Sequence, residues 1–246
     1  MRLRGYISAT GSAGTIAAGD FLRTEHPDVR VIATEALQCP TLLRCGFGDH
    51  RIEGIGDKHI PWVHNVRNTD MVAAIDDEAC MQIMRLFNED AGRKHLQSEG
   101  VDIKTLDQLN LAGISGICNL VAGIKAAKYY EMSDRDVIFF PMTDSMQLYG
   151  SRIEELRQEI GPYKELDAAK AFARYVQGAM PDNIRELNYQ DRKQLHNFKY
   201  FTWVEQQQRD ANDLRKLWDP DFWTETFAQV DQWDRQIEDF NRRVNA

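Results

Sequence analysis

The segment Tyr6-Ile-Ser-Ala-Thr-Gly-Ser-Ala-Gly-Thr-Ile-Ala-Ala-Gly-Asp-Phe-Leu22 decides the fold, because it predicts a strand, a tight turn and a helix in succession. Residues 6–9 are a short, mostly apolar run, as a buried strand requires. Residues 11–15 are small and include two glycines, so the backbone can turn sharply and approach a ligand closely. A helix is expected to begin at Ile16.

This turn is a candidate anion-binding site. Backbone N–H groups at the start of a helix have no partner inside the helix, and the helix dipole places partial positive charge there. Thr10, Ser12 and Thr15 add hydroxyl donors to the same turn. A phosphate group is the expected ligand. On this segment alone the alternative stays open, since many strand-turn-helix units with two glycines bind nothing.

The composition of the chain excludes several classes of protein. Its 246 residues are 43% hydrophobic and 28% charged, which is ordinary for a large globular unit. A net charge of -8 and an isoelectric point near 5.3 argue against nucleic acid or an anionic membrane as the main partner. No apolar run approaches the roughly 20 residues of a membrane span, and the N-terminus lacks a signal-peptide pattern. A cytoplasmic protein is expected.

The cysteines and histidines do not predict a metal site. The cysteines lack Cys-x-x-Cys spacing, so reduced thiols are expected at Cys39, Cys45, Cys80 and Cys118. Three histidines fall in or near the glycine-rich residues 46–62, but without the spacing of metal ligands. That glycine-rich segment is long enough to be a functional loop.

Further apolar runs predict the other strands of a parallel sheet. They are Val29–Thr34, Val63–Arg67 and Val137–Phe140, with helical segments between them. The last run is almost wholly apolar, which is typical of a central strand buried on both faces. Glu35 lies about 20 residues after the turn, where dinucleotide-binding folds place a ribose-binding acid. Because the glycine pattern of such folds is absent, a nucleotide-binding module is the weaker alternative.

After residue 150 the pattern changes to charged, amphipathic helices. We therefore expect an α/β portion at residues 1–150 and a helical extension at residues 151–246. The extension carries an aromatic set that is expected to pack onto the α/β body or a second subunit: Trp203, Trp218, Phe222, Trp223, Phe227, Trp233 and Phe240. The fold class is α/β, with an open, mostly parallel sheet flanked by helices.

Six segments, taken in order, resemble the C-terminal half of the fold type II pyridoxal-phosphate (PLP) enzymes, the cysteine synthase and cystathionine β-synthase group. The family's Gly-Thr-Gly-Gly-Thr phosphate loop is similar to residues 11–15, and its His-Lys-Ile-Gln-Gly-Ile-Gly loop, which ends in Ile-Pro, is similar to residues 50–61. Four further motifs match Ile32–Ala36, Ile75–Ala79, Gly113–Gly116 and Pro141–Thr143. The fold implied is the tryptophan synthase β-like PLP fold.

The resemblance implies a cofactor and a role for each matching residue. The PLP phosphate is expected at Gly11, Ser12, Ala13, Gly14 and Thr15. The Thr143 hydroxyl is expected beside the pyridine nitrogen, which suits β-elimination and β-replacement on a small amino-acid substrate. Gly54, Ile55 and Gly56 are expected to line the mouth of the active site. Ala13 and Gly116 depart from the family motifs, which leaves the substrate and nucleophile open.

The resemblance also implies that a segment is absent. In the family, the Schiff-base lysine lies upstream of the phosphate loop, and no lysine here has its context, Lys58 included. We therefore expect no catalytic residue here, and a chain that is inactive alone and resembles a fragment or one subunit of a split enzyme. Its expected partner is a complementary N-terminal half or a second copy. An apolar surface should lie uncovered near Tyr6–Ala9 and Val137–Phe140. The alternative is a non-catalytic partner or scaffold subunit that keeps the fold.

Overall fold

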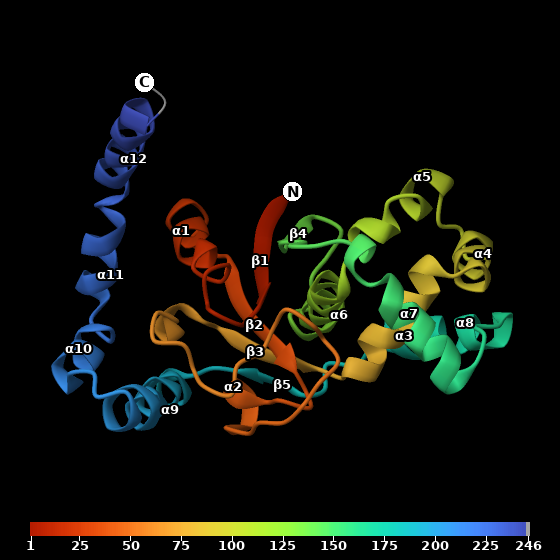
Figure 1. Cartoon of the computed structure of the whole chain (residues 1–246), viewed down its shortest axis with the longest axis horizontal. Coiled ribbons are helices and arrows are strands. Elements are labelled where there is room, and N and C mark those ends of the chain that lie inside the picture. The colour runs from red at the N-terminus through yellow and green to blue at the C-terminus, as the bar shows by residue number, and fades with distance from the viewer. Residues whose placement is uncertain (245–246) are drawn as a thin grey trace. The chain divides into compact units, whose positions relative to one another are not determined.

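The computed structural model describes residues 1–244, and the chain divides into two compact units, Met1–Leu195 and His196–Ala246. The first unit contains the sheet, with helices around it (Figure 1). Its strands are β1 (Arg2–Ala9), β2 (Arg30–Ala36), β3 (Met71–Ile75), β4 (Asp136–Phe139) and β5 (Ile184–Glu186). They lie in the order β4-β1-β2-β3-β5. The expected α/β class with a mostly parallel sheet is confirmed.

Four of the strands are parallel, and their register is regular. Ala9 lies opposite Thr34, and Thr34 lies opposite Ala73, so β1, β2 and β3 end at one edge of the sheet. β4 runs parallel to β1, whereas β5 runs antiparallel to β3. The carboxyl ends of parallel strands are the place where open α/β sheets bind ligands.

The helices of the first unit begin with α1, which follows the first strand. Their bounds are α1 (Ala18–Glu25), α2 (Thr41–Arg44), α3 (Asp77–Asn88), α4 (Asp90–Ser98), α5 (Ile103–Leu106), α6 (Ile114–Tyr129), α7 (Gly150–Ile160), α8 (Glu165–Ala171) and α9 (Tyr189–Lys199), the last of which crosses into the second unit. Three short 3-10 helices are η1 (Val66–Asn68), η2 (Leu109–Leu111) and η3 (Met146–Leu148), and η4 (Phe172–Gln177) is a π-helix.

Two helices cover opposite faces of the sheet. A Cβ atom added at Gly19 of α1 would lie 2.8 Å from Val31 and 3.0 Å from Tyr6, so this helix packs closely on the face that carries those side chains. On the other face, a Cβ atom added at Gly123 of α6 would lie 3.4 Å from Ile7. Because successive strand residues point to opposite faces, Tyr6 and Ile7 divide the core into two layers.

The prediction of a strand at Val63–Arg67 is wrong, and the third strand lies at Met71–Ile75 instead. Val63 is 53% exposed, and the polar side chains after it turn toward α1, where Asn65 Nδ2 donates to Asp20 Oδ2 at 3.1 Å. Residues 71–75 are uninterrupted apolar residues, and all of them are buried. Continuous apolar character is what a strand covered on both faces requires.

The prediction that Val137–Phe140 forms a central strand is also wrong. β4 lies at the edge of the sheet, with Val137 37% and Phe139 54% exposed. Two apolar side chains are thus exposed at the edge where an uncovered apolar surface was expected. That expectation is wrong at Tyr6, which is 2% exposed and stacks on Phe139 with 5.9 Å between the ring centroids. Side chains alternate along β4: Ile138 packs against the core, whereas Val137 and Phe139 on either side of it are exposed.

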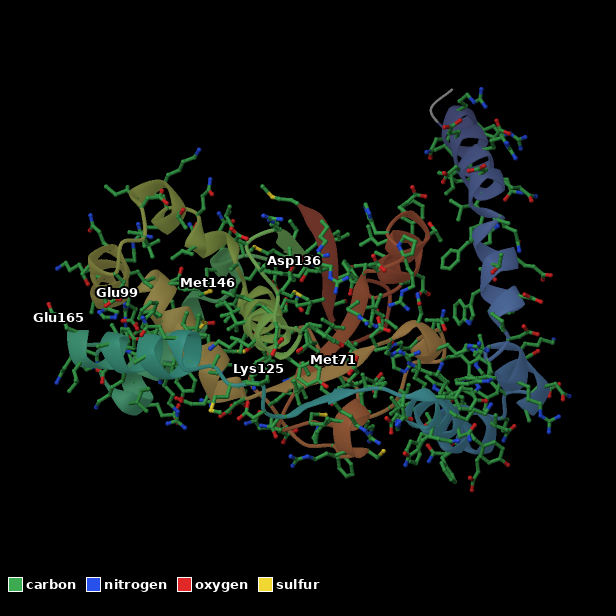
Figure 2. The ribbon with its side chains drawn as sticks, turned by 180° about the vertical axis from the view of Figure 1, so that it is seen from behind. Met71, Glu99, Lys125, Asp136, Met146 and Glu165 are labelled. Atoms are coloured by element: carbon green, nitrogen blue, oxygen red, sulfur yellow. The ribbon has the colours of Figure 1, made fainter. Side chains whose placement is uncertain are left out.

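Residues 151–195 pack with the sheet rather than apart from it. α8 contacts α3 and α4, and β5 pairs with β3, so a short strand lies within a segment that we expected to be helical. Lys125 Nζ near the end of α6 donates to Asp182 Oδ1 at 2.5 Å and holds the chain just before β5 (Figure 2). A three-residue strand leaves too little apolar alternation to be visible in sequence.

The second unit contains only helical elements among its described residues. They are η5 (Tyr200–Gln206), a π-helix, and α10 (Ala211–Lys216), α11 (Pro220–Phe227) and α12 (Val230–Val244). Asp219 caps α11 and Pro220 is its first residue. Part of the aromatic set packs inside the unit: the Trp218 ring lies 5.1 Å from that of His196, and Trp223 Nε1 donates to the Leu217 carbonyl at 3.0 Å.

Membrane-spanning helices, metal sites and disulfides were not expected from the sequence, and residues 1–244 of the structure bear on each. In that range no single helix is long and apolar enough to span a membrane, while one sharply bent pair, Ile103–Leu111 with Ile114–Tyr129, passes the same test of length and composition. The described residues contain no group of three or more histidine, cysteine or acidic side chains placed to hold a metal ion. All four cysteines are free thiols.

Candidate active site

A cavity of about 340 Å³ lies beyond the carboxyl ends of β1 and β4. Most of the predicted site residues line it, although they come from four separate segments of the chain. The lining residues are Ala9, Gly11, Ser12, Ala13, Gly14, Thr15, Gly54, Ile55, Ser115, Asn119, Pro141 and Thr143. Gly56 stands just behind this lining, where its amide donates to the Thr10 carbonyl at 2.7 Å. The structure thus brings the predicted residues together around one space.

The loop after β1 presents a row of backbone N–H groups with no protein partner. Thr10 N still donates to the Thr34 carbonyl of β2, and regular turn bonds begin again at Ala18 N. Among the described residues, no hydrogen bond from the amides of residues 11–17 is found. Backbone donors without partners are uncommon in folded proteins, so such a row indicates a place for an anion or for water.

Side chains from β1 hold this loop in place from below. Tyr6 donates its hydroxyl to the Thr15 carbonyl at 2.5 Å, and the hydroxyl oxygens of Ser8 and Thr15 lie 2.7 Å apart. The helix begins at Ala18, two residues after the expected Ile16, because the intervening residues form turns that end in i to i+3 hydrogen bonds. The loop is therefore longer than predicted and exposes more of its amides.

Ala13 stands in a backbone conformation that favours glycine. Its φ is 68°, in the left-handed region, and its side chain is 3% exposed. An L-residue in that region costs about 1–2 kcal/mol relative to its ordinary conformations. The departure from the family's glycine at this position is therefore accompanied by backbone strain.

Replacing Ala13 by glycine should stabilise the folded chain by about 1 kcal/mol, because relief of the left-handed strain exceeds the extra entropy of the unfolded glycine. The free energy of unfolding in urea measures this change. Gly150→Ala, at a position where an added Cβ atom meets nothing within 4 Å, serves as a control for substitutions between the same two residue types. A destabilised Ala13→Gly variant would show that the loop does not carry this strain.

The opposite end of the cavity is lined by hydroxyl and amide groups. Ser115, in the first turn of α6, has its hydroxyl oxygen 3.2 Å from that of Thr143, in the loop after β4. One turn further along α6, Asn119 Nδ2 donates to the Pro141 carbonyl at 3.0 Å. Since that carbonyl can only accept, the contact fixes the orientation of the Asn119 amide.

Asn119 is a site residue that the sequence prediction missed. Its side chain is 2% exposed and its Oδ1 atom has no hydrogen-bond partner in the described part of the chain. A buried acceptor without a donor costs about 1–3 kcal/mol, which a donor on a ligand can offset. Its spacing of four residues from Ser115 on one helix was the signal that could have identified it.

The predicted mouth loop, residues 50–61, is held at two points. Arg51 NH2 donates to Asp77 and Glu78 of α3 at 2.7 Å each. Burial alone would raise the pKa of the Asp77 carboxyl, but the hydrogen bonds from Arg51 outweigh it and lower that pKa. On the other side, Arg152 of α7 pairs with Glu53. Glu53 on one side and Gly56, whose amide donates to the Thr10 carbonyl, on the other side keep Gly54 and Ile55 at the cavity.

Glu35, the candidate ribose-binding acid, does not face the cavity. It is 2% exposed, and its two carboxylate oxygens accept from the amides of Leu42 and Leu43 at 2.8 Å each, at the start of α2. Burial raises the pKa of Glu35 to about 7, even though those amides favour the charged form. The geometry gives no support to the nucleotide-binding alternative.

This raised pKa predicts a dependence of stability on pH. The native state binds a proton on Glu35 that the unfolded state releases near its ordinary pKa of 4.5. The stabilisation that the bound proton gives the native state is complete below pH 4.5 and is lost as the pH rises to about 7. Relative to Glu35→Gln, the wild-type free energy of unfolding should fall by up to about 3 kcal/mol over this range. Urea titrations at several pH values measure it, with the exposed Glu25→Gln as control; parallel curves for wild type and Glu35→Gln would contradict it.

Lysines are absent from the lining of this cavity within residues 1–244. Lys58 lies in the mouth loop but is exposed to solvent. Lys125 is on α6, the helix of Ser115 and Asn119, but its ammonium group is bound by Asp182 (Figure 2). The cavity therefore offers donors for an anion and acceptors for a ring, but no amine of its own.

Comparison with known proteins gives partial relatives. No protein-family model matches the chain. A cysteine synthase from Staphylococcus aureus (strain Mu50 / ATCC 700699) is 26% identical over 124 residues, which are 50% of this chain and 34% of that protein. O-ureido-L-serine synthase from Streptomyces lavendulae is 25% identical over 129 residues, 52% of this chain and 35% of that protein. The chain thus spans about a third of the length of these relatives.

The fold has a counterpart among solved structures. The crystal structure of a cysteine synthase from Entamoeba histolytica superposes with a TM-score of 0.52 and 18% sequence identity, covering 70% of this chain and 46% of that one. At that identity the likeness concerns the fold alone. Together with the sequence relatives, it confirms the resemblance drawn from the six motifs.

Proposed function

We propose that this chain, a homologue of the cysteine synthases with the fold of the type II PLP-dependent enzymes, binds pyridoxal 5'-phosphate in the cavity described above. It is the C-terminal part or subunit of a cytoplasmic enzyme that catalyses β-elimination or β-replacement on a small amino acid. The observation that carries the proposal is the row of amides without partners at residues 11–17, of which residues 11–15 line a cavity whose other end holds Ser115, Asn119 and Thr143.

The residues present fit the parts of this cofactor. The free amides of the Gly11–Thr15 loop, at the N-terminal side of α1, suit a phosphate dianion. Thr143 and Ser115 place hydroxyl groups at the far end of the cavity, where either could serve as a neutral hydrogen-bond partner of a pyridine nitrogen. The unpartnered Oδ1 of Asn119 is a buried polar atom that a bound ligand would satisfy. The cofactor, once bound, supplies an electron sink for bond cleavage at the amino acid.

The chain's own residues then act by binding and orientation. The loop amides would hold the phosphate, and the neutral hydroxyl of Thr143 would be the partner of the ring nitrogen, a partner that supplies no charge to protonate it and so suits elimination and replacement at the β-carbon. Gly54 and Ile55 leave room at the cavity for the substrate, because neither carries a bulky polar group. In elimination the α-carbon loses its proton and the β-carbon loses its leaving group with the bonding electron pair; in replacement a nucleophile then adds at the β-carbon and a proton returns to the α-carbon.

The amine that must hold the cofactor covalently is proposed to come from a complementary segment. No lysine lines the cavity within the described residues, and the matched relatives are about three times as long as the matched region. A separate N-terminal half that carries this lysine would then complete the site. The same absence of a cavity lysine favours the second candidate function, a non-catalytic partner subunit that keeps the fold.

Binding and complementation together test the proposal. The full chain should bind PLP and pyridoxine 5'-phosphate with similar affinity in calorimetry, because the phosphate and ring are held without an aldehyde adduct. Borohydride should trap no lysine on the chain alone. Co-expression with a lysine-bearing N-terminal half of a cysteine synthase should produce trapping and turnover of an amino acid with a leaving group on its β-carbon.

Each result separates the candidates. Binding with complementation supports the enzyme subunit, and binding without turnover in any complemented form supports the non-catalytic partner. Absence of binding of either phosphorylated pyridine would overturn both. A chain that traps PLP on its own lysine would contradict the proposed division of the site, and Lys58 would be the first residue to map.

A further inference from the structure

Helix α12 carries a stripe of apolar side chains that no other described residue of the second unit covers. Five apolar residues follow one another at alternating spacings of three and four: Val230, Trp233, Ile237, Phe240 and Val244. All five are exposed, from 41% at Val230 and Trp233 to 65% at Phe240 and Val244. Alternating spacings of three and four are the a and d positions of a heptad, the pattern by which one helix packs against another.

The other faces of α12 are polar and nearly balanced in charge. They carry the carboxylates of Asp231, Asp234, Glu238 and Asp239 and the guanidinium groups of Arg235, Arg242 and Arg243. A helix that lies on an anionic membrane carries an excess of basic residues on its polar face, which α12 lacks. The chemistry of the helix therefore favours a protein helix as the occupant of the stripe.

The charges along α12 are divided between its two ends. Asp231 and Asp234 lie in the first turns, whereas Arg242 and Arg243 lie in the last turn. If two such helices pair in antiparallel fashion, the acidic end of each lies beside the basic end of the other. If they pair in parallel, like charges meet at both ends. The helix is thus complementary to a reversed copy of itself.

The apolar stripe is compatible with the same arrangement. In an antiparallel pair in which Ile237 faces Phe240 of the other copy, Trp233 faces Val244 of that copy, and the two-fold axis repeats both contacts. Each layer then joins a large side chain to a smaller one, which suits interdigitated packing. In this register the paired seam runs from residue 233 to residue 244, a length of about 16 Å at the helical rise of 1.5 Å per residue.

We propose that α12 is a self-association element, through which two copies of this chain pair by antiparallel packing of their α12 helices. The interaction rests on the α12 stripe alone and is independent of the cavity in the first unit. A seam of less than two heptads is short, so the pairing is concentration-dependent rather than permanent.

The apolar contribution is tested with the full chain by sedimentation equilibrium over a concentration series. Wild type should approach the mass of a dimer as concentration rises. Ile237→Asp and Phe240→Asp should each weaken the association at least about 100-fold, because each buries a carboxylate in the seam of both copies. Gln232→Asp adds the same carboxylate on the polar face and should leave the association unchanged. Circular dichroism checks that helix content is retained.

The orientation is tested by reversing charges. In an antiparallel pair, the double variant Asp231→Arg, Asp234→Arg should weaken association about tenfold, since each end then repels its neighbour. Adding Arg242→Asp and Arg243→Asp to the same chain should restore it. In a parallel pair, charges of the same sign meet at each end before and after either change, so neither change would alter the association.

Three results would overturn the proposal. The first is a wild-type chain that stays monomeric at every concentration, including when a different protein is found to bind α12. The second is a dimer that survives Ile237→Asp with its affinity unchanged, because its interface then lies elsewhere. The third is an association that the reversed acidic end does not weaken, because the helices then do not pair in antiparallel fashion.

Discussion

Gly14→Asp should remove the binding of inorganic phosphate and of PLP by this chain, lowering the affinity at least about 100-fold. The aspartate side chain would stand beside the unpartnered amides of residues 11–17 and bind them in the anion's place. Two negative charges about 4 Å apart near a protein surface repel by about 4 kcal/mol, which exceeds the 2.7 kcal/mol of a 100-fold change.

The design separates charge from shape. A Cβ atom at Gly14 would meet only Ser12 Oγ, at 3.9 Å, and Gly14 is not in the left-handed region, so the backbone accepts a side chain. Gly14→Asn has the size of aspartate without its charge and should lose much less affinity. Calorimetry with phosphate and with PLP measures both variants, after thermal melts show equal folding. Equal affinities for wild type and Gly14→Asp would exclude the loop as the phosphate site.

Arg85→Met should destabilise the first unit by about 3–5 kcal/mol, the largest stability effect expected from a single substitution outside the site. Arg85 is 2% exposed, and its Nε donates to Glu89 Oε1 at 2.5 Å while NH2 donates to the Gly161 carbonyl at 2.9 Å. Its guanidinium also lies 4.8 Å from the centre of the Tyr163 ring. Removing it leaves the buried Glu89 carboxylate with less of its compensating charge.

The chain offers matched controls for this prediction. Arg157 donates its Nε to the other oxygen of Glu89 at 2.9 Å, but its side chain is 47% exposed, so Arg157→Met should cost no more than about 1 kcal/mol. Arg85→Met combined with Glu89→Leu should recover a large part of the loss, because the orphaned charge is then removed. Urea unfolding measures all three variants. A loss below about 1 kcal/mol for Arg85→Met would mean that the buried ion pair is not what joins α3 to the α7–α8 connection.

The phosphate loop and the start of α6 could be predicted because local chemistry determines them. Small residues between an apolar run and a helix leave few alternatives at residues 11–15, and Gly113 before an apolar helix gives α6 a clear beginning. The helix after Asp76 was predictable for the same reason, since the Asp76 carboxylate accepts from Glu78 N and caps it. In each case the signal and the structure lie within a few residues of one another.

The misplaced features depend on distant partners instead. The sequence of Val63–Arg67 predicts a strand, but in the structure Asn65 donates a hydrogen bond to Asp20 of α1, a contact far away in sequence. Whether β4 is central or at an edge is decided by which strands pair beyond it, and its own residues do not record that. Asn119 is an ordinary helix residue in sequence, and only the approach of Pro141 makes its amide part of the cavity.

The order of strands in the sheet has a consequence for the time course of synthesis. β1, β2 and β3 are neighbours both in sequence and in space, so they can pair as soon as the ribosome has released residues 1–75. β4 must return to β1, and its Asp136 carboxylate meets Arg2 across 134 residues of chain. Long-range pairing of this kind is slow, because a large loop must close before any contact is gained. The outer edge of β1 therefore stays open until β4 emerges, and the nascent chain is most exposed to misassembly during that interval.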